Sequence, residues 1–406
     1  MDNPQETLLA AFPLLWRRKP RGDPQRLHVM PPYKIFIKPC TGWRYSPIYK
    51  WKFITKLNYL LPLLAFSNTA NRNKKNHFAN YVAFNSRGLN YPTGFFNKRS
   101  YSTTNNSKNQ IKLDPWFLTG FIDAEGTFIV PIRPKTDTKC GWEALCEFKL
   151  ALHVKDLPLL EAIKAYLGSI GTITVSKSSD VALFRVGSVN HLSVIIDHLT
   201  RYPLITQKRA DFELFKKVIE IKLSGRHTTL DGIQEIVNIR ASLNRGLTEG
   251  LLIAFPHTTP VIRPIVGEID LKLLEGFWVA GFASGEGNFL IGISKSPASR
   301  TGFHCYLRFK VSQDCRDEFL LRSLIAFFGC GNCTRFDNII EYVCVNTKDI
   351  NNIILPFFKK YPILGVKALD FEDWCLGADI IQNKAHLTPG GLAQLKGLKT
   401  GMNKNR

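Results

Sequence analysis

The chain carries one pattern twice, and this internal repeat constrains the fold more than any other feature. Residues 118–126 read LTGFIDAEG and residues 279–287 read VAGFASGEG, so each apolar run ends on Glu followed by Gly. Three later segments repeat in the same order: 148–160 and 309–321, 202–213 and 361–372, and 227–244 and 386–403. The offset is 161 positions for the first two matches and 159 for the last two. We infer a tandem duplication of a unit of about 135–150 residues, an ordinary domain size.

Each repeat predicts the same order of helices and strands. Asp114 and Pro115 suit the N-cap and first position of a helix that runs through the first motif to Glu125, where Gly126 ends it. Two alternating strands follow, then a helix (158–167 and 318–328), two more strands (within 171–186 and 332–345) and further helices. This order predicts an α+β fold with helices on one face of an antiparallel sheet.

The basic charge is concentrated ahead of the repeats. The 406 residues carry a formal net charge of +21, and residues 1–113 account for +16, with 19 Lys and Arg against three acids. We divide the chain into a basic, poorly ordered N-terminal extension (1–113), a first unit (114–253), a Pro-rich linker (254–270) and a second unit (271–406). The extension has the composition of a mitochondrial targeting arm, and residues 95–104 are similar to a presequence cleavage junction. Fused upstream sequence or a nucleic-acid-binding arm are the alternatives.

Cysteine usage and hydropathy narrow the class of protein. Nine Cys without a regular spacing indicate reduced thiols. Cys330 and Cys333 have a metal-type spacing, but no second Cys or His pair follows at a suitable distance, which argues against a zinc site. No segment reaches the roughly 18 apolar residues of a membrane span, so we expect no membrane partner.

The strands after each motif predict one polar, basic sheet face. Apolar and polar residues alternate there, as Phe128 and Val130 do with Thr127 and Pro131. The polar face is either an ordinary solvated surface or, with two sheets side by side, a groove suited to the major groove of DNA. The candidate DNA-contacting residues are Thr127, Arg133, Lys135, Lys149, Arg185, Asn288, Ser294, Arg308, Lys310 and Arg335.

Small residues at helical spacing predict that the two motif helices pack together. Gly120 and Ala124 lie on one stripe of the first helix, and Gly281 and Gly285 occupy the same places in the second. Glu125 and Glu286 would then meet at the C-terminal ends, where two carboxylates repel each other and oppose the helix dipoles. A shared divalent cation such as Mg²⁺ would relieve this repulsion. The alternative is two capped helices with solvated Glu side chains.

The two motifs resemble those of the LAGLIDADG homing endonucleases in the double-motif, single-chain form. The stretches FKLALHVKD (148–156) and YPLITQKRADFE (202–213) are similar to the fungal mitochondrial intron-encoded branch. The resemblance implies two pseudo-symmetric αββαββα units, with the motif helices at the central interface and two antiparallel sheets forming a DNA-binding saddle. It also implies that Glu125 and Glu286, helped by the backbone carbonyls of Ala124 and Gly285, bind metal near the scissile phosphates, one acid for each strand.

The resemblance extends to other site residues. It implies that Lys208 and Lys367 polarise the active-site solvent and that Gln313 joins this shell. The first unit has Leu152 followed by His153 where a matching Gln would stand. Ser284 replaces the counterpart of Asp123, at a position that is not the metal ligand.

The implied activity is Mg²⁺-dependent hydrolysis that makes a double-strand break in a long asymmetric site of double-stranded DNA, with Mn²⁺ or Ca²⁺ able to occupy the same metal site. A monomer and a mitochondrial location are expected. Members of the family also act as RNA maturases, so the host group I intron RNA is an alternative partner. A domesticated organelle RNA-processing factor is a third alternative. The target sequence cannot be read from these residues, because it depends on side-chain geometry and DNA deformability.

Overall fold

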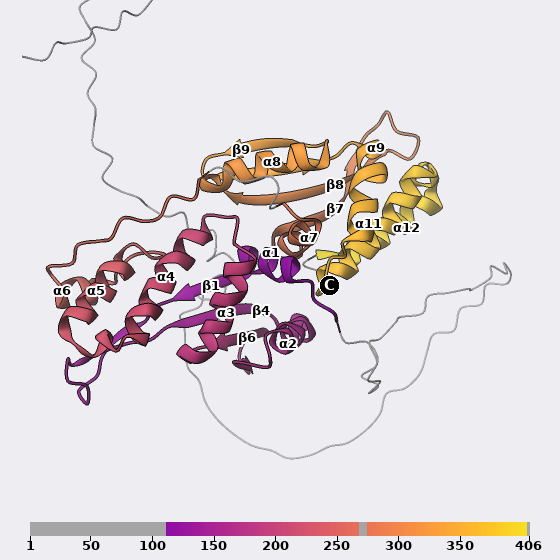
Figure 1. Cartoon of the computed structure of the whole chain (residues 1–406). Coiled ribbons are helices and arrows are strands. Elements are labelled where there is room, and N and C mark those ends of the chain that lie inside the picture. Colours follow the sequence, from indigo (N-terminus) through magenta and orange to yellow (C-terminus); the bar gives the residue numbers. More distant parts are fainter. Residues whose placement is uncertain (1–110, 268–273, 404–406) are drawn as a thin grey trace, which may run out of the picture. The chain divides into compact units, whose positions relative to one another are not determined.

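The computed structural model describes residues 111–267 and 274–403 (Figure 1). The predictions for the N-terminal extension therefore lie outside the described residues, except at 111–113, and so do those for 268–270 of the linker and 271–273 of the second unit. Leu113 is buried and belongs to the core of the first repeat.

The motif helix of the first repeat, α1, spans Pro115–Glu125, as predicted. Asp114 caps it, because its Oδ1 accepts a hydrogen bond from the Trp116 amide at 2.9 Å. The chain leaves the helix at Gly126 in an extended conformation and continues directly into a strand. The elements that follow are β1 (Gly126–Ile129), β2 (Ile132–Pro134), β3 (Trp142–Ala144), β4 (Glu147–His153), η2 (Val154–Asp156), α2 (Leu157–Tyr166), β5 (Thr172–Val175), β6 (Val181–Val186), α3 (Val189–Arg201), α4 (Lys208–Leu223), η3 (Arg226–Thr228), α5 (Leu230–Ala241) and α6 (Glu249–Ala254).

The second repeat follows the same order. Its motif helix, α7, spans Gly276–Glu286 and also passes directly into a strand. The elements that follow are β7 (Gly287–Lys295), β8 (Phe303–Asp314), η5 (Cys315–Asp317), α8 (Glu318–Phe328), β9 (Asn332–Phe336), β10 (Ile339–Cys344), α9 (Thr347–Asp349), η6 (Ile350–Ile354), α10 (Leu355–Lys360), α11 (Lys367–Gln382), η7 (Ala385–Leu387) and α12 (Pro389–Gly401).

Each repeat contains a four-stranded antiparallel sheet. The strand orders are β1-β4-β6-β5 and β7-β8-β10-β9, so the two repeats share one topology. Phe128 pairs with Phe148, and Phe289 pairs with Phe309, and all four rings are buried. Because directly opposed residues point to the same side of a sheet, these rings define the core face, and the helices cover it. The predicted α+β fold of two pseudo-symmetric units is confirmed.

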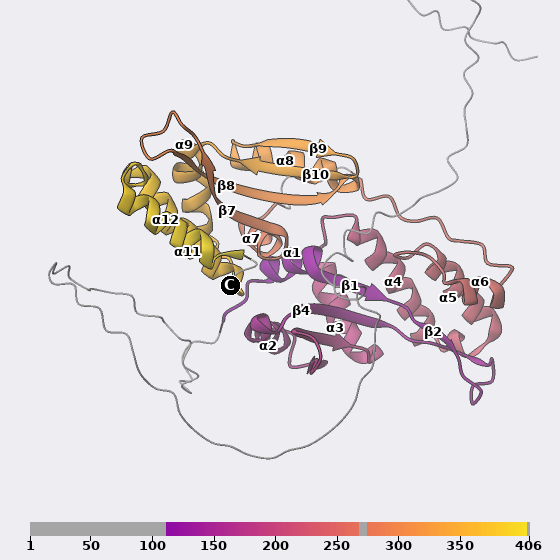
Figure 2. The ribbon, with the colours of Figure 1, turned by 180° about the vertical axis from the view of Figure 1, so that it is seen from behind.

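The structure adds elements to the simple αββαββα order. In the first repeat, β1 ends before Pro131, whose missing N–H cannot join the ladder, and residues 132–144 form a separate hairpin of β2 and β3. In the second repeat the corresponding strands run unbroken to Lys295 and from Phe303. Each repeat also closes with two further helices, α4 and α5 or α11 and α12 (Figure 2).

The linker is partly fixed on the first repeat. Arg263 Nη1 lies 2.6 Å from Asp211 Oδ1, and the Val261 amide donates to Asn238 O at 3.2 Å. Ile262 and Ile265 are nonetheless 91% and 93% exposed.

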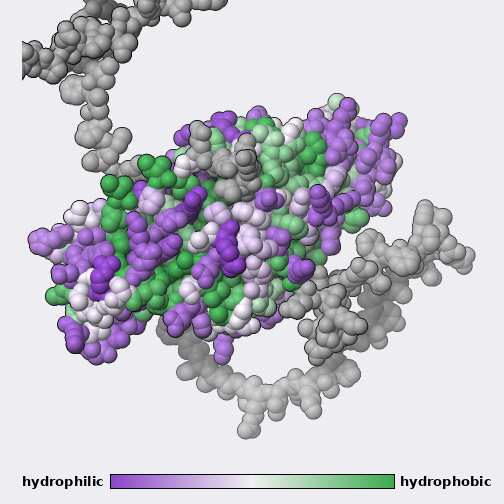
Figure 3. All heavy atoms as spheres, viewed as in Figure 1, coloured by the Kyte–Doolittle hydropathy of each residue, from purple (hydrophilic) through white to green (hydrophobic). Residues whose placement is uncertain are grey.

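The face seen in Figure 3 mixes hydrophilic and hydrophobic residues. Among the helices of the described ranges, none has the length and apolar character needed to cross a membrane.

Candidate active site

The motif helices α1 and α7 lie side by side in both views, with their backbones in contact (Figures 1 and 2). A Cβ atom added to Gly120 would stand 2.0 Å from the Trp278 carbonyl oxygen, and one added to Gly281 would stand 2.0 Å from that of Phe117. No side chain fits at these distances, so glycine is required at both positions. The structure thus brings together the small residues that the sequence placed on one stripe of each helix.

The close approach continues to the ends of the helices. A Cβ atom on Gly285 would lie 2.4 Å from the Ala124 Cβ and 3.4 Å from Glu125 Oε1. The helices end at Glu125 and Glu286, both partly buried. Since helix C-termini carry partial negative charge, two carboxylates and several carbonyl oxygens concentrate negative charge at this point.

Two lysines reach this negative cluster from elsewhere in the chain. Lys208 and Lys367 are the first residues of α4 and α11. Lys208 Nζ donates to the carbonyl oxygens of Ile122 at 3.0 Å and Ala124 at 3.2 Å. Lys367 Nζ donates to that of Gly285 at 2.5 Å. The ammonium groups thus offset the charge of the helix ends.

The ionisation of Lys208 responds to both acids. Burial is the largest effect and lowers the pKa of Lys208, while the negative charges of Asp123, Glu286 and Glu125 act to raise it. Both motif acids therefore act electrostatically on one lysine, which places them in the same small region. Each repeat contributes one acid and one lysine to this region.

Asp123, the acid just before the end of the first motif, has a different role from Glu125. Its carboxylate is buried and accepts hydrogen bonds from the Ile205 amide at 2.9 Å, from the Thr206 amide and hydroxyl at 3.2 and 2.6 Å, and from Trp278 Nε1 at 2.9 Å. Burial raises the pKa of Asp123, and the donors and Lys208 act against that rise. The side chain is saturated with donors, so it ties α1 to α7 and to the segment that leads into α4.

Ser284 holds the equivalent segment in the second repeat. Its hydroxyl donates to Ala280 O at 2.8 Å and accepts from the Leu364 amide at 3.1 Å. Leu364 precedes α11 as Ile205 precedes α4, so both motif positions hold the segment that positions a lysine. The second motif has Ser284 in place of an acid, and its hydroxyl keeps the contact with the segment before α11.

The polar residues of the sheets lie on the face opposite the core. Thr127 pairs with Lys149, Lys149 with Arg185, and Asn288 with Lys310, so these side chains share the open faces of their sheets. Several are held by acids: Lys149 and Arg185 by Glu147, Lys310 by Glu341, and Arg133 and Lys135 of the β2–β3 hairpin by Glu143. Ser294 is exposed near the end of β7, and Arg308 pairs with Leu290.

Arg335 does not lie where the sequence placed it. It pairs with the buried Ile340 across β9 and β10, and its Nη1 lies 2.9 Å from Glu318 Oε2 on α8. The side chain therefore points to the helix-covered face, and the open-face assignment is wrong. Alternation in a short, mostly exposed strand could not distinguish the two faces without the register. Gln313 lies in β8 and pairs with Ile340; it stands two residues beyond Val311, the partner of Gly287, which is the first residue after α7.

One asparagine in each repeat, not among the predicted site residues, links the end of the repeat to its first strand and to the helix that bears the lysine. The backbone N–H of Asn244 donates to Asp211 Oδ1 at 3.0 Å, and its side-chain Nδ2 donates to Phe128 O at 2.7 Å. Asn403 makes the same pair of bonds with Asp370 and Phe289 at 2.9 and 3.2 Å. Both adopt a positive φ, which Asn tolerates better than most residues. Their place at the end of a repeated segment was the available signal.

The chain is similar to known proteins over both repeats. A family model described as LAGLIDADG endonuclease matches residues 118–219 and 279–377. "Probable intron-encoded endonuclease 3" of Neurospora crassa is 38% identical over 297 residues, which cover 73% of this chain and 55% of that protein. "Probable intron-encoded endonuclease 2" of the same fungus is 39% identical over 314 residues, which cover 72% of this chain and 68% of that protein. The chain belongs to the LAGLIDADG endonuclease family.

Solved LAGLIDADG structures share the fold. One of them is the I-SmaMI LAGLIDADG homing endonuclease bound to cleaved DNA, which is 41% identical to this chain. The match covers 73% of this chain and 98% of the I-SmaMI chain, with a TM-score of 0.71. I-SmaMI has also been solved with two lysines changed to alanine, and bound to uncleaved DNA in the presence of calcium ions, with TM-scores of 0.70.

The donor set of this LAGLIDADG site fits a hard divalent cation. Two carboxylates and nearby backbone carbonyls supply only oxygen ligands, which Mg²⁺ and Ca²⁺ prefer. The side chains that could hold the ion are Glu125 and Glu286, and the backbone oxygens of the residues just before them, Ala124 and Gly285, could join them. Those two oxygens also accept from Lys208 and Lys367, so the lysines and a cation would share them.

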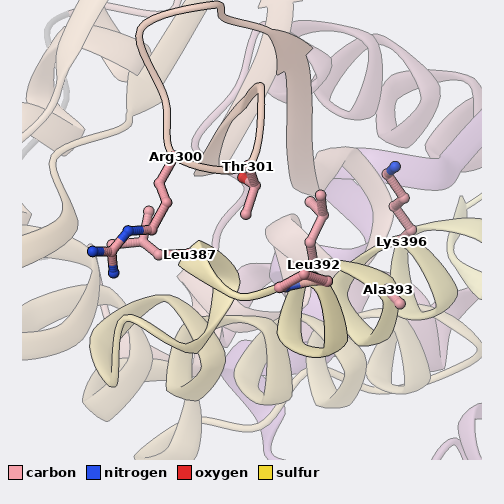
Figure 4. Close-up of a pocket in the computed structure, with 7 residues that line it drawn as sticks. Arg300, Thr301, Leu387, Leu392, Ala393 and Lys396 are labelled. Atoms are coloured by element: carbon pink, nitrogen blue, oxygen red, sulfur yellow. The ribbon is translucent and has the colours of Figure 1, made fainter.

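A hollow and a cysteine cluster among the described residues include neither motif acid. The hollow in Figure 4 is lined by Arg300, Thr301, Leu387, Leu392, Ala393 and Lys396, and none of the site residues predicted from the sequence lines it. Cys333 Sγ contacts Leu321 O, and Cys330 instead lies near Cys344 and Asp349, with ligand atoms within 4.8 Å of one another. Burial raises the pKa of Cys344 to about 12, which disfavours the thiolate that a metal needs.

Proposed function

We propose that this chain is a divalent-metal-dependent DNA endonuclease that makes a double-strand break in a long asymmetric site. The observation that carries the proposal is the pairing of Glu125 and Glu286 at the ends of two helices packed backbone to backbone, with one lysine beside each. Two acid–lysine pairs related by the internal duplication suit a substrate with two antiparallel strands.

Each residue has a distinct part in this proposal. Glu125 and Glu286 hold Mg²⁺, or Mn²⁺ or Ca²⁺, with the carbonyls of Ala124 and Gly285. The bound cation would stabilise negative charge at the phosphate and make water more acidic. Lys208 and Lys367, fixed on the helix ends by hydrogen bonds, orient solvent and attract the phosphate. Gln313 adds an amide on the second side only.

The lysine substitutions in the solved I-SmaMI structures support the role of the lysines. The two lysines changed to alanine in its double variant stand 159 positions apart in that chain. Lys208 and Lys367 also stand 159 positions apart. The same separation is what two equivalent lysines on a duplicated scaffold should have.

The DNA itself is proposed to bind across the open sheet faces. Thr127, Lys149 and Arg185 contribute from the first sheet, with Arg133 and Lys135 from the β2–β3 hairpin. Asn288, Ser294, Arg308 and Lys310 contribute from the second. Because Lys149, Arg185 and Lys310 are held by acids, their positions are fixed before DNA arrives.

The test is a selection for cleaved sites. Purified protein is incubated with a library of randomised DNA duplexes in Mg²⁺, and the cut ends are sequenced; parallel reactions contain EDTA or the Glu125→Gln/Glu286→Gln variant. We expect one recurring asymmetric site that is cut in both strands and only with metal and both acids. No enrichment of any site would overturn the proposal.

A mitochondrial, monomeric enzyme is part of the same proposal. Support comes from the basic composition of residues 1–113 and from the intron-encoded relatives. Imaging a reporter fused to residues 1–113 tests the location, and a diffuse cytosolic signal would contradict it. The RNA-maturase alternative stays a prediction, since no contact of the described residues favours RNA over DNA.

A further inference from the structure

Two aspartates reach across the repeats to the start of the lysine-bearing helices. Asp317 Oδ1, in the second repeat, accepts a hydrogen bond from the Gln207 amide of the first repeat at 2.8 Å. Asp156 Oδ1, in the first repeat, accepts one from the Val366 amide of the second repeat at 2.6 Å. Gln207 and Val366 are the residues immediately before Lys208 and Lys367. The two contacts are therefore reciprocal.

These aspartates stand where they would ordinarily cap their own helices. Asp156 and Asp317 occupy the N-cap positions of α2 and α8, and neither side chain makes a capping bond to its own helix. An N-cap Asp bonded to its own helix is usually worth about 1 kcal/mol. Here the side chain instead serves the first turn of a helix in the other repeat, so local helix stability does not explain the contact.

Both aspartates lie in tightly packed or buried surroundings. Gly365, next to Val366, has a φ of +75°, and a Cβ atom there would lie 2.5 Å from Asp156 Oδ1, so a larger residue would displace the carboxylate. Asp317 is 9% exposed, and burial raises its pKa to about 7. A carboxyl group held at such a cost in solvation, with a backbone amide of the other repeat as its partner, has a specific positioning role.

We propose that Asp156 and Asp317 are positioning residues that fix each active-site lysine from the opposite repeat. The sheet of each repeat is connected to its aspartate through η2 or η5, which directly follow β4 and β8. If one repeat shifts on the DNA, its aspartate therefore also shifts the lysine of the other repeat. This inference rests on the proposed nuclease function, and it makes the cut of each strand depend on both repeats.

The consequence is a crossed pattern of strand cleavage. Asp317→Ala should slow the strand that depends on Lys208, and Asp156→Ala the strand that depends on Lys367. A misplacement of about 1 Å can cost on the order of 100-fold in rate, so we expect the affected strand to slow at least about 10-fold. Asp→Asn variants keep a side-chain carbonyl that accepts the amide and should retain most of the rate.

The experiment measures nicking of each strand of a duplex that carries a different fluorophore on each 5′ end. Lys208→Met and Lys367→Met first identify the strand that each lysine serves, and Glu161→Ala, an exposed acid on α2, is the control. The proposal predicts that Asp317→Ala matches Lys208→Met in strand bias and that Asp156→Ala matches Lys367→Met, with DNA affinity changed less than about 3-fold. Equal slowing of both strands, or Asn variants as slow as Ala variants, would overturn it.

Amide hydrogen exchange tests the contacts without any cleavage. Asp317→Ala should accelerate exchange at Gln207 and leave Val366 unchanged, and Asp156→Ala should do the reverse. If no DNA is cut by the wild-type protein, the proposed function fails while this arm still decides the positioning role. Unchanged exchange at both amides would refute that role.

Discussion

At the scale of single residues, His198 shows how the fold around α1 limits ionisation. The buried His198 Nε2 lies 3.1 Å from the Thr119 hydroxyl. That hydroxyl donates its proton to Tyr202 O at 3.0 Å, so it can only accept from the imidazole. Burial and then Arg201 lower the pKa of His198 from 6.5 to about 4. A neutral ring with its proton on Nε2 satisfies all three groups.

This lowered pKa predicts a loss of stability in acid. Above pH 6.5 the ring is neutral in both states and its contribution is complete. As the pH falls from 6.5 to about 4 the unfolded chain takes up a proton that the folded chain refuses. The free energy of unfolding should fall by up to about 3 kcal/mol over this range. Urea unfolding at several pH values measures it, and a His198→Gln variant with the same slope would contradict the assignment.

At the scale of elements, the α1–α7 contact should be the least tolerant of added volume. Gly281→Ala would place a methyl group 2.0 Å from the Phe117 carbonyl oxygen, so the helices would have to separate. We expect a loss of at least about 3 kcal/mol in the free energy of unfolding. Gly397→Ala is the matched control, since a Cβ atom there meets nothing within 4 Å on the exposed side of α12. The control should be neutral or gain up to about 1 kcal/mol. Equal stabilities of the two variants would show that the helices are not in backbone contact.

Much of this arrangement could be predicted from the duplication. A repeated pattern fixes equivalent positions, so the ends of α1 and the glycine stripes follow from comparing the copies. The places of Lys208 and Lys367 came from the resemblance to the LAGLIDADG family. The reach of Asp156 and Asp317 could not be predicted. Both aspartates stand at the N-cap position of the next helix, and only the three-dimensional packing brings a backbone amide of the other repeat within hydrogen-bond distance.

The errors have physical reasons as well. The face of Arg335 depends on the register of β9 against β10, which a short exposed strand does not encode. The β2–β3 hairpin arises because Pro131 interrupts a strand that the second repeat continues unbroken. Both cases were decided by hydrogen-bond pairing, which alternation of side chains alone does not specify.

At the scale of the whole molecule, the two open sheet faces should share the binding of DNA. Lys149 and Lys310 occupy equivalent middle positions on the two sheets, opposite Thr127 and Asn288. If each contacts one phosphate, the Lys149→Ala/Lys310→Ala variant should lower the slope of log Kd against log salt by about 2. Fluorescence anisotropy over a range of salt concentrations measures the slope. A Lys217→Ala/Lys359→Ala variant removes the same charge from the helices and should leave the slope unchanged, and equal slopes for both variants would contradict the assignment.

The proposed function requires the paired acids at the ends of α1 and α7 to form one metal-dependent cleavage centre. The most direct measurement compares cleavage and binding of a selected DNA site by the wild-type protein and by Glu125→Gln/Glu286→Gln in Mg²⁺. Glutamine keeps the size of each side chain and removes its charge, so the helix pair should stay folded and bind DNA with a Kd within about 3-fold of the wild type. We expect the double variant to cleave at least about 1,000-fold more slowly, as after removal of a central group of an active site. Cleavage by the double variant at the wild-type rate would contradict it.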